Sequence, residues 1–260
     1  MKTMATVSEI SQYLNTILPT SLSCDWDNDG LMVCPDPEAS VQKILFALDI
    51  TPAVVNYAKK IGAELIISHH PLIFSGIRRM DGSDGTSRKV MDLIQSGIAA
   101  MSFHTRLDAA DGGINDILAS LFGLTDVQKF GAEGDDSARV GTLPSEMRFE
   151  DFCDLVKKTL GAPAVCGAKG NETVSRLAVL GGSGKDYIRA AQKMGADTFL
   201  TGEVNYNYLL DAAENGLSIV TAGHYYTEAP FFAFFEKTLA EKFGAFTFVN
   251  FPDGCEFYYA

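Results

Sequence analysis

The feature that most constrains the fold is a series of short, fully apolar segments separated by amphipathic ones. Strands of a parallel sheet have this composition when helices cover both faces of the sheet. In the first half, the predicted strands are 43–49, 63–68 and 98–103, and the predicted helices are 6–17, 52–61, 90–96 and 114–122. We therefore predict an α/β fold with mostly parallel sheets covered by helices.

The second half of the chain repeats this pattern. Segment 43–48 resembles 176–181, and 62–68 resembles 195–201, with both pairs separated by 133 residues. We predict two similar lobes related by internal duplication; the alternative is two α/β units that only look alike. The expected domains are a first α/β lobe at 1–124, a connection at 125–146 and a second α/β lobe at 147–260, with the site in the cleft between the lobes.

Composition and charge argue against several classes of partner. The 260 residues include 33 acids and 21 bases, and the net charge of −12 repels the phosphates of nucleic acid. No segment reaches the roughly 20 apolar residues of a membrane span, and the first residues lack a signal-peptide core. The 5 cysteines form no C-x-x-C pair, which argues against a disulfide framework. We expect a soluble, cytoplasmic protein that binds neither nucleic acid nor membrane.

The histidines of the chain occupy one kind of position. There are 4 of them, His69, His70, His104 and His224, and each follows a predicted strand or begins a helix. Ligands of parallel α/β sheets bind at the carboxyl ends of the strands. Histidines that only fill a core would not all be found there, so the pattern favours a functional site.

The spacing of these residues predicts a site for two divalent metal ions. His69 and His70 are adjacent at a strand end, so their imidazoles can reach two ions about 3.5–4 Å apart. Asp108 offers a carboxylate that can bridge both ions. Glu228 shares a face with His224 if the segment is helical. Imidazole and carboxylate ligands suit Zn, Fe or Mn.

Two further residues are candidates for a supporting or catalytic role. His104 precedes Asp108 by four residues and would orient that carboxylate or a bound water. Glu203 occupies the position that corresponds to His70 in the repeat. Either His104 or Glu203 could move a proton during a reaction.

Five motifs together resemble the Nif-three-like family, whose members are also called GTP cyclohydrolase 1 type 2 homologues. The motifs are W-D-N-D-G-L at 26–31, S-H-H-P-L-I-F at 68–74, H-T-x-x-D-x-x-x-G at 104–112, T-G-E at 201–203 and G-H-Y-x-T-E at 223–228. The resemblance spans residues 7 to about 240. It implies two metal ions held by His69, His70, Asp108, His224 and Glu228, a two-lobed α/β fold, and a toroidal homohexamer whose sites face an internal cavity.

The chain also departs from the family pattern. Arg106 replaces the usual Asn of the H-T-N-x-D motif, and Asn205-Tyr-Asn207 replaces a histidine that some members carry after T-G-[DE]. Neither change removes a ligand, but both could alter the substrate that the pocket accepts. Longer members carry an inserted domain, for which the segment 125–146 is too short.

Three segments have more than one interpretation. Residues 25–30 form either a loop at the mouth of the site or a capped turn with Trp26 packed inward. Residues 181–185, G-G-S-G-K, do not match a Walker A motif; they either cradle an anion or form a plain strand–helix turn, which we favour. Residues 231–235, F-F-A-F-F, form either helix core or an oligomer interface.

These observations support two hypotheses about function. The first is a metal-dependent hydrolase that acts on a nucleotide or another phosphate-containing small molecule, by GTP cyclohydrolase 1 type 2-like or phosphoester chemistry. The alternative is a metal-binding, metal-trafficking or scaffold protein without turnover. An open coordination position on each ion would distinguish the enzyme from the alternative.

Overall fold

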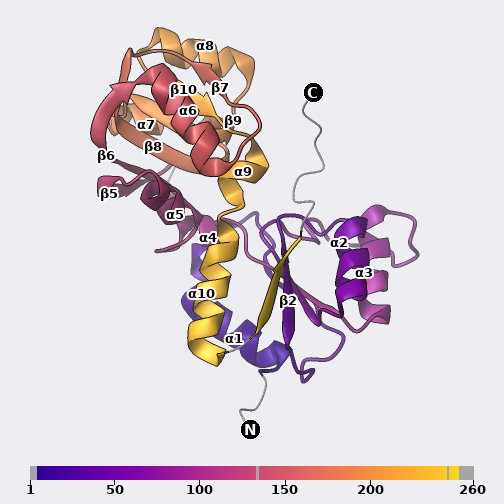
Figure 1. The fold of residues 1–260 in the computed structure, drawn as a ribbon. Coiled ribbons are helices and arrows are strands. Elements are labelled where there is room, and N and C mark those ends of the chain that lie inside the picture. The colour runs from indigo at the N-terminus through magenta and orange to yellow at the C-terminus, as the bar shows by residue number, and fades with distance from the viewer. Residues whose placement is uncertain (1–4, 133–134, 245, 252–260) are drawn as a thin grey trace. The chain divides into compact units, whose positions relative to one another are not determined.

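A computed structural model describes residues 5–132, 135–244 and 246–251 (Figure 1). The described chain forms two compact units. Among the described residues, the first unit combines 5–107 with 232–244 and 246–251, and the second unit comprises 108–132 and 135–231. Each unit has its own sheet, and the short helix α4 (Thr105–Ala109) spans the boundary in the sequence.

The sheet of the first unit is mostly parallel, as predicted. Its strand order is β1-β4-β3-β2-β11, in which β1 is antiparallel to β4 and the other neighbours are parallel. The strands are β1 (Gly30–Val33), β2 (Lys43–Ala47), β3 (Leu65–Ser68), β4 (Ala99–Ser102) and β11 (Thr247–Asn250). β3 and β4 are buried at every position, which explains why their sequences are continuously apolar.

Helices cover both faces of this sheet. They are α1 (Val7–Ile17), α2 (Pro52–Ile61), α3 (Gly85–Gln95) and α10 (Phe231–Phe243), with a 3-10 turn η1 (Thr20–Leu22) after α1. Figure 1 shows α2 and α3 on one face and α1 and α10 on the other. On the α10 face, the ring of Phe46 stacks on Phe235 with centroids 6.1 Å apart. The helix-core interpretation of residues 231–235 is therefore confirmed for Phe235.

The sheet of the second unit is mixed, with a parallel centre. Its strand order is β5-β6-β8-β9-β10-β7. The strands are β5 (Thr125–Phe130), β6 (Ala138–Arg148), β7 (Cys166–Ala168), β8 (Thr173–Ser183), β9 (Thr198–Glu203) and β10 (Ser218–Thr221). β8, β9 and β10 are parallel to one another, whereas β5, β6 and β7 are antiparallel to their neighbours.

Helices also pack on this second sheet. They are α5 (Ile114–Leu121), α6 (Phe149–Leu160), α7 (Ile188–Lys193), α8 (Tyr206–Glu214) and α9 (His224–Glu228), with a 3-10 turn η2 (Lys185–Tyr187). α7 and α8 share a core with Ala178, Phe199 and Ile219 of the central strands. α5 and α9 both pack against β8, which brings the beginning and the end of the second unit to the same strand.

The pairing of strands repeats between the two sheets. Ile44 pairs with Leu65 in the first sheet, and Leu177 pairs with Thr198 in the second, so both partners are displaced by 133 residues. The spatial order β2-β3-β4 also corresponds to β8-β9-β10. The predicted likeness of two α/β units is confirmed, and the duplication that would explain it stays a prediction.

The division of the chain differs from the predicted domains. Residues 125–146, predicted as a connection, form β5 and most of β6 in the second sheet. The boundary between the units follows residue 107 instead of 124, and α10 and β11 return to the first unit. The segment is polar because β5 is an edge strand whose first five residues are exposed, which hides the apolar pattern of a buried strand.

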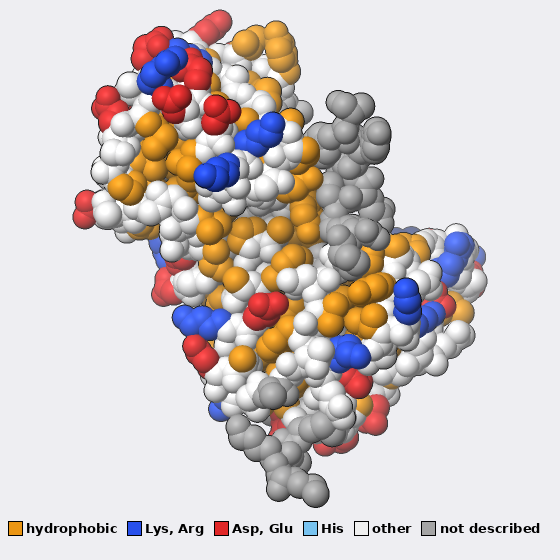
Figure 2. All heavy atoms as spheres, viewed as in Figure 1, with side chains coloured by type: hydrophobic (Ala, Val, Ile, Leu, Met, Phe, Trp, Pro, Cys, Tyr) orange, Lys and Arg blue, Asp and Glu red, His pale blue; other side chains and the backbone are white. Residues whose placement is uncertain are grey.

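Two further features of the described residues concern membrane helices and surface charge. No helix among the residues that the structure describes is long and apolar enough to cross a membrane. Figure 2 shows acidic and basic side chains interspersed on the visible face of each unit. Both findings agree with the composition of the chain.

Candidate metal centre

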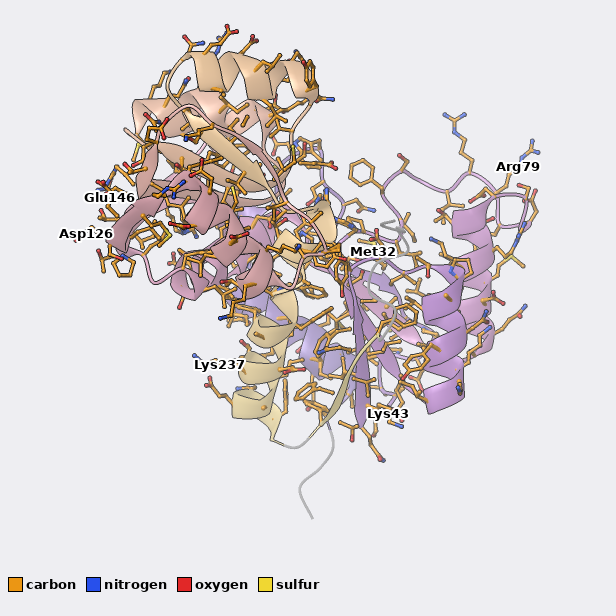
Figure 3. All side chains as sticks on the ribbon, turned by 45° about the horizontal axis from the view of Figure 1, so that its top comes forward. Met32, Lys43, Arg79, Asp126, Glu146 and Lys237 are labelled. Atoms are coloured by element: carbon orange, nitrogen blue, oxygen red, sulfur yellow. The ribbon has the colours of Figure 1, made fainter. Side chains whose placement is uncertain are left out.

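In the first unit, the candidate side chains follow the carboxyl ends of neighbouring strands. His69 and His70 come directly after β3, His104 follows β4, and Asp49 follows β2. Figure 3 labels Lys43 at the opposite, amino end of β2. In this unit the histidines therefore lie at the edge of the sheet that the sequence predicted.

The three imidazoles of the first unit form one cluster. One ring nitrogen from each of His69, His70 and His104 lies within 4.8 Å of the others. The ring centroids are 5.1 to 5.6 Å apart. His69 is buried, whereas His70 and His104 are partly exposed. Three nitrogen donors at this separation are a group that could hold a divalent metal ion.

Each of these imidazoles is oriented by an oxygen atom at Nδ1. The contacts are His69 with the carbonyl of Phe103 at 2.9 Å, His70 with Oδ1 of Asp49 at 2.8 Å, and His104 with Oδ1 of Asp27 at 3.1 Å. Because a carbonyl and an ionised carboxylate only accept hydrogen bonds, the proton of each neutral ring is placed on Nδ1. Nε2 is then the ring nitrogen that can ligate a metal ion.

Asp27 is the most constrained of these acceptors. Its side chain is fully buried beside His104. It accepts hydrogen bonds from the backbone N–H of Thr105 at 3.1 Å and from the Thr105 hydroxyl at 2.6 Å. Burial raises the pKa of Asp27, but the hydrogen bonds from His104 and Thr105 outweigh it and hold the pKa below its ordinary value. The carboxylate is therefore ionised at neutral pH and orients the His104 ring.

Arg106 fixes the loop that carries Asp27. Its guanidinium is buried and donates to Asp29, at 2.8 Å from Nε and 2.6 Å from Nη2. It also donates to the carbonyl of Leu18 at 2.8 Å. Asp29 accepts in turn from the backbone N–H of His104 at 3.3 Å. Arg106 therefore makes its polar contacts inside the fold, and its influence on the substrate stays a prediction.

Trp26 lies on the same loop and is turned toward solvent. Its side chain is 61% exposed. The ring centroid lies 5.9 Å from that of His104 and 6.0 Å from that of Phe74. The interpretation of an inward-packed Trp26 is therefore wrong, because Asp27 takes the inward position of the loop. The loop lies against the histidine cluster of its own unit, as the alternative interpretation requires.

The second unit carries a His–Glu pair on one helical turn. α9 begins at His224 and ends at Glu228, which confirms the predicted helix. Side chains four residues apart share a helical face, and Nε2 of His224 lies 3.1 Å from Oε2 of Glu228. Nδ1 of the same ring lies 3.3 Å from Oε1 of Glu203. Glu203, predicted as a supporting residue, thus contacts a predicted ligand directly.

Glycines of β8 and β9 form the surface on which α9 rests. A Cβ at Gly182 would lie 2.3 Å from Oε1 of Glu228 and 3.2 Å from Nε2 of His224. A Cβ at Gly202 would lie 2.9 Å from Cα of His224. Gly182 also has a φ of +70°, which other residues rarely adopt. The glycines of the 181–185 segment thus allow the backbone to approach the His–Glu pair closely.

Asp108 is connected to the same strand through Asn115. The buried Asn115 side chain donates to the backbone carbonyl of Asp108 at 3.2 Å and accepts from the N–H of Gly181 at 2.8 Å. A Cβ at Gly181 would lie 3.1 Å from Cγ of Glu228. One buried amide therefore links the backbone of Asp108 to the strand beneath α9. The second unit thus places Asp108, His224 and Glu228 on one connected framework.

A family model described as Duf34/NIF3 (NGG1p interacting factor 3) matches residues 5–252. The chain belongs to the Duf34/NIF3 family. The match covers both units, so the resemblance that five motifs suggested extends over the described fold. Membership agrees with the mixed α/β architecture of two sheets and helices.

Relatives of this Duf34/NIF3 protein are named as GTP cyclohydrolase 1 type 2 homologs. One from Clostridium perfringens is 36% identical over 229 residues, which are 86% of this chain and 87% of that protein. Another from Methanocaldococcus jannaschii is 34% identical over 224 residues, 85% of this chain and 88% of that protein. The word homolog in these names records similarity and leaves the activity of each relative open.

Solved structures have the same fold as this Duf34/NIF3 protein. A Staphylococcus aureus protein of 25% identity matches with a TM-score of 0.89, covering 99% of this chain and 100% of that chain. Reduced HcgD from Methanocaldococcus jannaschii, 29% identical, matches with a TM-score of 0.83 over 95% of this chain and 98% of its own.

Sequence reasoning missed two acids of the candidate metal centre. Asp49 holds His70, and its position at the end of the strand predicted at 43–49 was a signal that could have identified it. Asp27 lies in the loop 25–30, but its partner His104 is 77 residues away. A contact between such distant positions is set by the tertiary fold, which spacing alone does not show.

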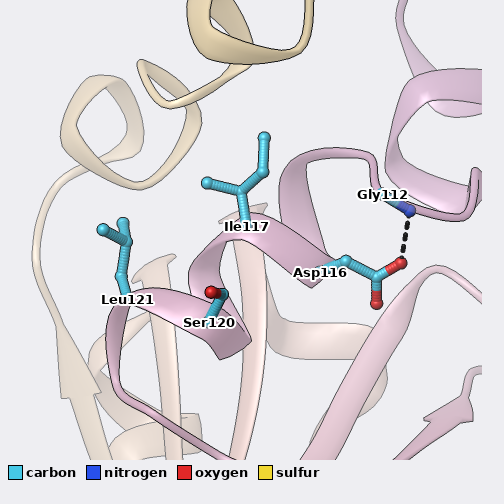
Figure 4. Close-up of a pocket in the computed structure, with 5 residues that line it drawn as sticks. All are labelled: Gly112, Asp116, Ile117, Ser120 and Leu121. Carbon is cyan, nitrogen blue, oxygen red and sulfur yellow. Dashed lines mark hydrogen bonds between the residues drawn. The ribbon is translucent and has the colours of Figure 1, made fainter. Parts of the chain in front are cut away.

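A separate cavity of about 300 Å³ lies along α5 in the second unit. Figure 4 shows its lining of Gly112, Asp116, Ile117, Ser120 and Leu121. Asp116 accepts a hydrogen bond from the N–H of Gly112 at 2.7 Å and forms an ion pair with Arg139. Because its charged lining residue is already paired and no histidine faces it, this cavity is not a candidate metal centre.

Proposed function

We propose that this protein binds two divalent metal ions and uses them to hydrolyse a nucleotide or another phosphate-containing small molecule. The proposed ligands are His69 and His70 of the first unit and Asp108, His224 and Glu228 of the second. The observation that carries the proposal is the orientation of the imidazoles in the first unit, each with Nδ1 on an oxygen acceptor. This arrangement is typical of histidines that ligate a metal through Nε2.

The donor set fits Zn, Fe or Mn and not a thiolate-bound metal, because it consists of imidazoles and carboxylates. Such ions lower the pKa of a bound water toward neutrality and polarise a carbonyl or phosphoryl oxygen. In this chain, Asp27 holds the proton of His104 on Nδ1, so Nε2 of His104 is the atom that would accept a proton from the reacting group. Glu203 keeps the His224 ring oriented.

The names of the relatives favour a guanine nucleotide as substrate and opening of its ring as the reaction. Phosphoester hydrolysis would use the same ligands and is the second chemistry to test. We further propose that the protein acts in the cytoplasm as a ring of six chains. The mass of the protein in solution, measured by light scattering, tests the hexamer: a monomer or dimer at micromolar concentration would contradict it.

Metal content per chain is the first test. Protein purified without chelator or a His tag should hold about two ions per chain by elemental analysis, as a dinuclear centre requires. Glu228→Ala should lose most of this metal, whereas Glu214→Ala, which removes an exposed carboxylate of α8, should lose none. Near-zero metal in the wild type, even after reconstitution, would contradict the proposed centre.

Turnover is the second test. Protein loaded with Mn, Fe or Zn should hydrolyse GTP or p-nitrophenyl phosphate well above the rate of a His69→Ala variant. If two ions bind but no rate exceeds that of the variant, the metal site is real and the hydrolase is not. That outcome would support metal binding or trafficking without turnover.

A further inference from the structure

We propose that Trp26 and Phe74, the aromatic platform, bind a planar nitrogen heterocycle beside the histidine cluster, as the base of a nucleoside. The inference rests on the proposed function, because it assigns the platform to the substrate of that site. It adds the part of the substrate that is recognised and the residues that recognise it.

The two rings are large, apolar and exposed together. Trp26 is 61% exposed and Phe74 is 54% exposed. Their centroids are 6.0 Å apart with an angle of 48° between the ring planes. Aromatic side chains of this size usually bury most of their area. Two that remain in water side by side mark a surface on which another flat, apolar group can be bound.

The loops under the platform are held in place by hydrogen bonds. The N–H of Asp27 donates to the carbonyl of Cys24 at 2.9 Å, which closes a tight turn around the tryptophan. The side chain of Asn28 donates to the carbonyl of Ile73 at 2.5 Å, which ties this turn to the residue before Phe74. The backbone that carries the two rings is therefore fixed before a ligand arrives, so less conformational entropy is lost on binding.

The platform adjoins the histidine cluster. The Trp26 ring meets the His104 ring edge to face, with centroids 5.9 Å apart and 72° between the planes. A heterocycle that stacks on the indole would therefore lie next to an imidazole of the candidate centre. This places a ring where the proposed hydrolysis would occur, and not at a remote surface.

The charge near the platform favours the base over the phosphates of a nucleotide. Asp25 is exposed and precedes Trp26 directly, and Asp49, which holds His70, has a side chain that is 58% exposed. Carboxylates repel an anionic group but not a neutral ring. The electron-rich face of an indole stacks on any nucleobase. We therefore expect the base, without its phosphates, to be sufficient for recognition.

Trp26 can serve as an intrinsic fluorescent probe of this binding, because the chain contains 1 tryptophan. Guanosine and adenosine, added to the metal-loaded wild-type protein, should quench the fluorescence of Trp26 in a saturable manner. Ribose 5-phosphate, which lacks a base, should not. Phe74→Leu should weaken binding and raise the half-saturation concentration by about 5- to 100-fold, the range expected from loss of one stacking partner.

Controls separate recognition from folding and from assembly. Tyr206→Leu removes a ring that is 75% exposed on α8 and should leave quenching unchanged. Thermal unfolding and metal content are measured for each variant. For Trp26→Leu, which lacks the reporter, nucleoside binding is followed by equilibrium dialysis and should fall by a similar factor.

Three results would overturn the proposal: no saturable binding of either nucleoside, equal quenching by ribose 5-phosphate, or an unchanged affinity in Phe74→Leu. A change of oligomer size in Trp26→Leu would also overturn it, since the platform would then be an interface between copies of the chain. Failure of the proposed hydrolase function is distinguishable from failure of this proposal. Metal content and turnover test the hydrolase, whereas nucleoside quenching is measured separately in the same samples.

Discussion

The two units hold their candidate ligands by different physical means. In the first unit, loops carry the imidazoles, and carboxylates such as Asp27 orient them across long sequence separations. In the second unit, one helical turn carries His224 and Glu228, and it rests on glycines that leave no room for a side chain. The first arrangement should therefore be sensitive to loss of charge, and the second to added volume.

The largest expected effect is on the charge network of the first unit. Arg106→Met should lower the free energy of unfolding by about 3–5 kcal/mol, because it leaves the buried Asp29 carboxylate unpaired. Lys59→Met is the control in the same unit, since its pair with Asp92 at 3.4 Å is solvent-exposed and should contribute less than about 1 kcal/mol. Urea unfolding measures both. Equal losses in the two variants would refute the special role of Arg106.

Added volume should damage the second unit next. Gly182→Ala should cost about 2–4 kcal/mol, since a Cβ there meets Glu228 and the backbone has a positive φ. Metal content should fall in the same variant. Gly161→Ala has a similar φ of +65° with nothing within 4 Å, so only the backbone term of about 1–2 kcal/mol applies. A Gly182→Ala protein as stable as Gly161→Ala would show that α9 is not tightly seated.

The two carboxylates that orient histidines in the first unit should differ from each other. Asp27→Asn replaces one oxygen of a buried carboxylate that accepts four hydrogen bonds with an NH2 group that cannot accept one, and it should cost about 1–3 kcal/mol. Asp49→Asn, at a side chain 58% exposed, should cost less than about 1 kcal/mol. If orientation of the rings matters for metal, both should weaken affinity by about 10- to 100-fold. Titration with a metal-sensitive dye measures this, and unaltered affinity in both variants would contradict the role of these acids.

The smallest expected effect concerns a thiol of the second unit. Burial, followed by the nearby Asp154 and Glu150 carboxylates, raises the pKa of Cys153 to about 11. Because the thiolate is the reactive form, the rate of Cys153 alkylation should rise about tenfold per pH unit between pH 8 and 10. Peptide mapping after iodoacetamide treatment measures the rate, with Cys166→Ser as control for its neighbour. A plateau below pH 10 would show that the thiol is less shielded than the fold indicates.

Local chemistry explains which parts of the fold were predictable. The helix predicted at 52–61 coincides with α2, because Thr51 caps its start, Pro52 occupies its first turn and Gly62 ends it in a left-handed conformation. The helix over His224–Glu228 and the histidines at strand ends were likewise visible as short-range patterns. Such features depend on neighbours within a few residues.

Features that depend on distant residues were not predictable in this way. The orientation of His104 depends on Asp27, and the fold of that loop depends on Arg106, whose partner Asp29 is 77 residues away. β5 was not predicted as a strand because an exposed edge strand lacks an apolar pattern. The boundary of the units differs from the predicted one because α5 packs against β6 and β8 of the second sheet. The return of the chain to the first unit was not predicted because β11, which pairs with β2, has only 4 residues.

The position of β11 has a consequence for the order in which a ribosome-bound chain folds. Every strand of the second sheet precedes residues 247–250 in the sequence, so the ribosome makes all strands of that sheet before it makes β11. The first sheet still lacks the neighbour of β2, from Lys43 to Phe46, and exposes a row of unpaired backbone groups until then. Completion of the first unit is therefore a late event, and until then the free edge of β2 can pair with a strand of another chain.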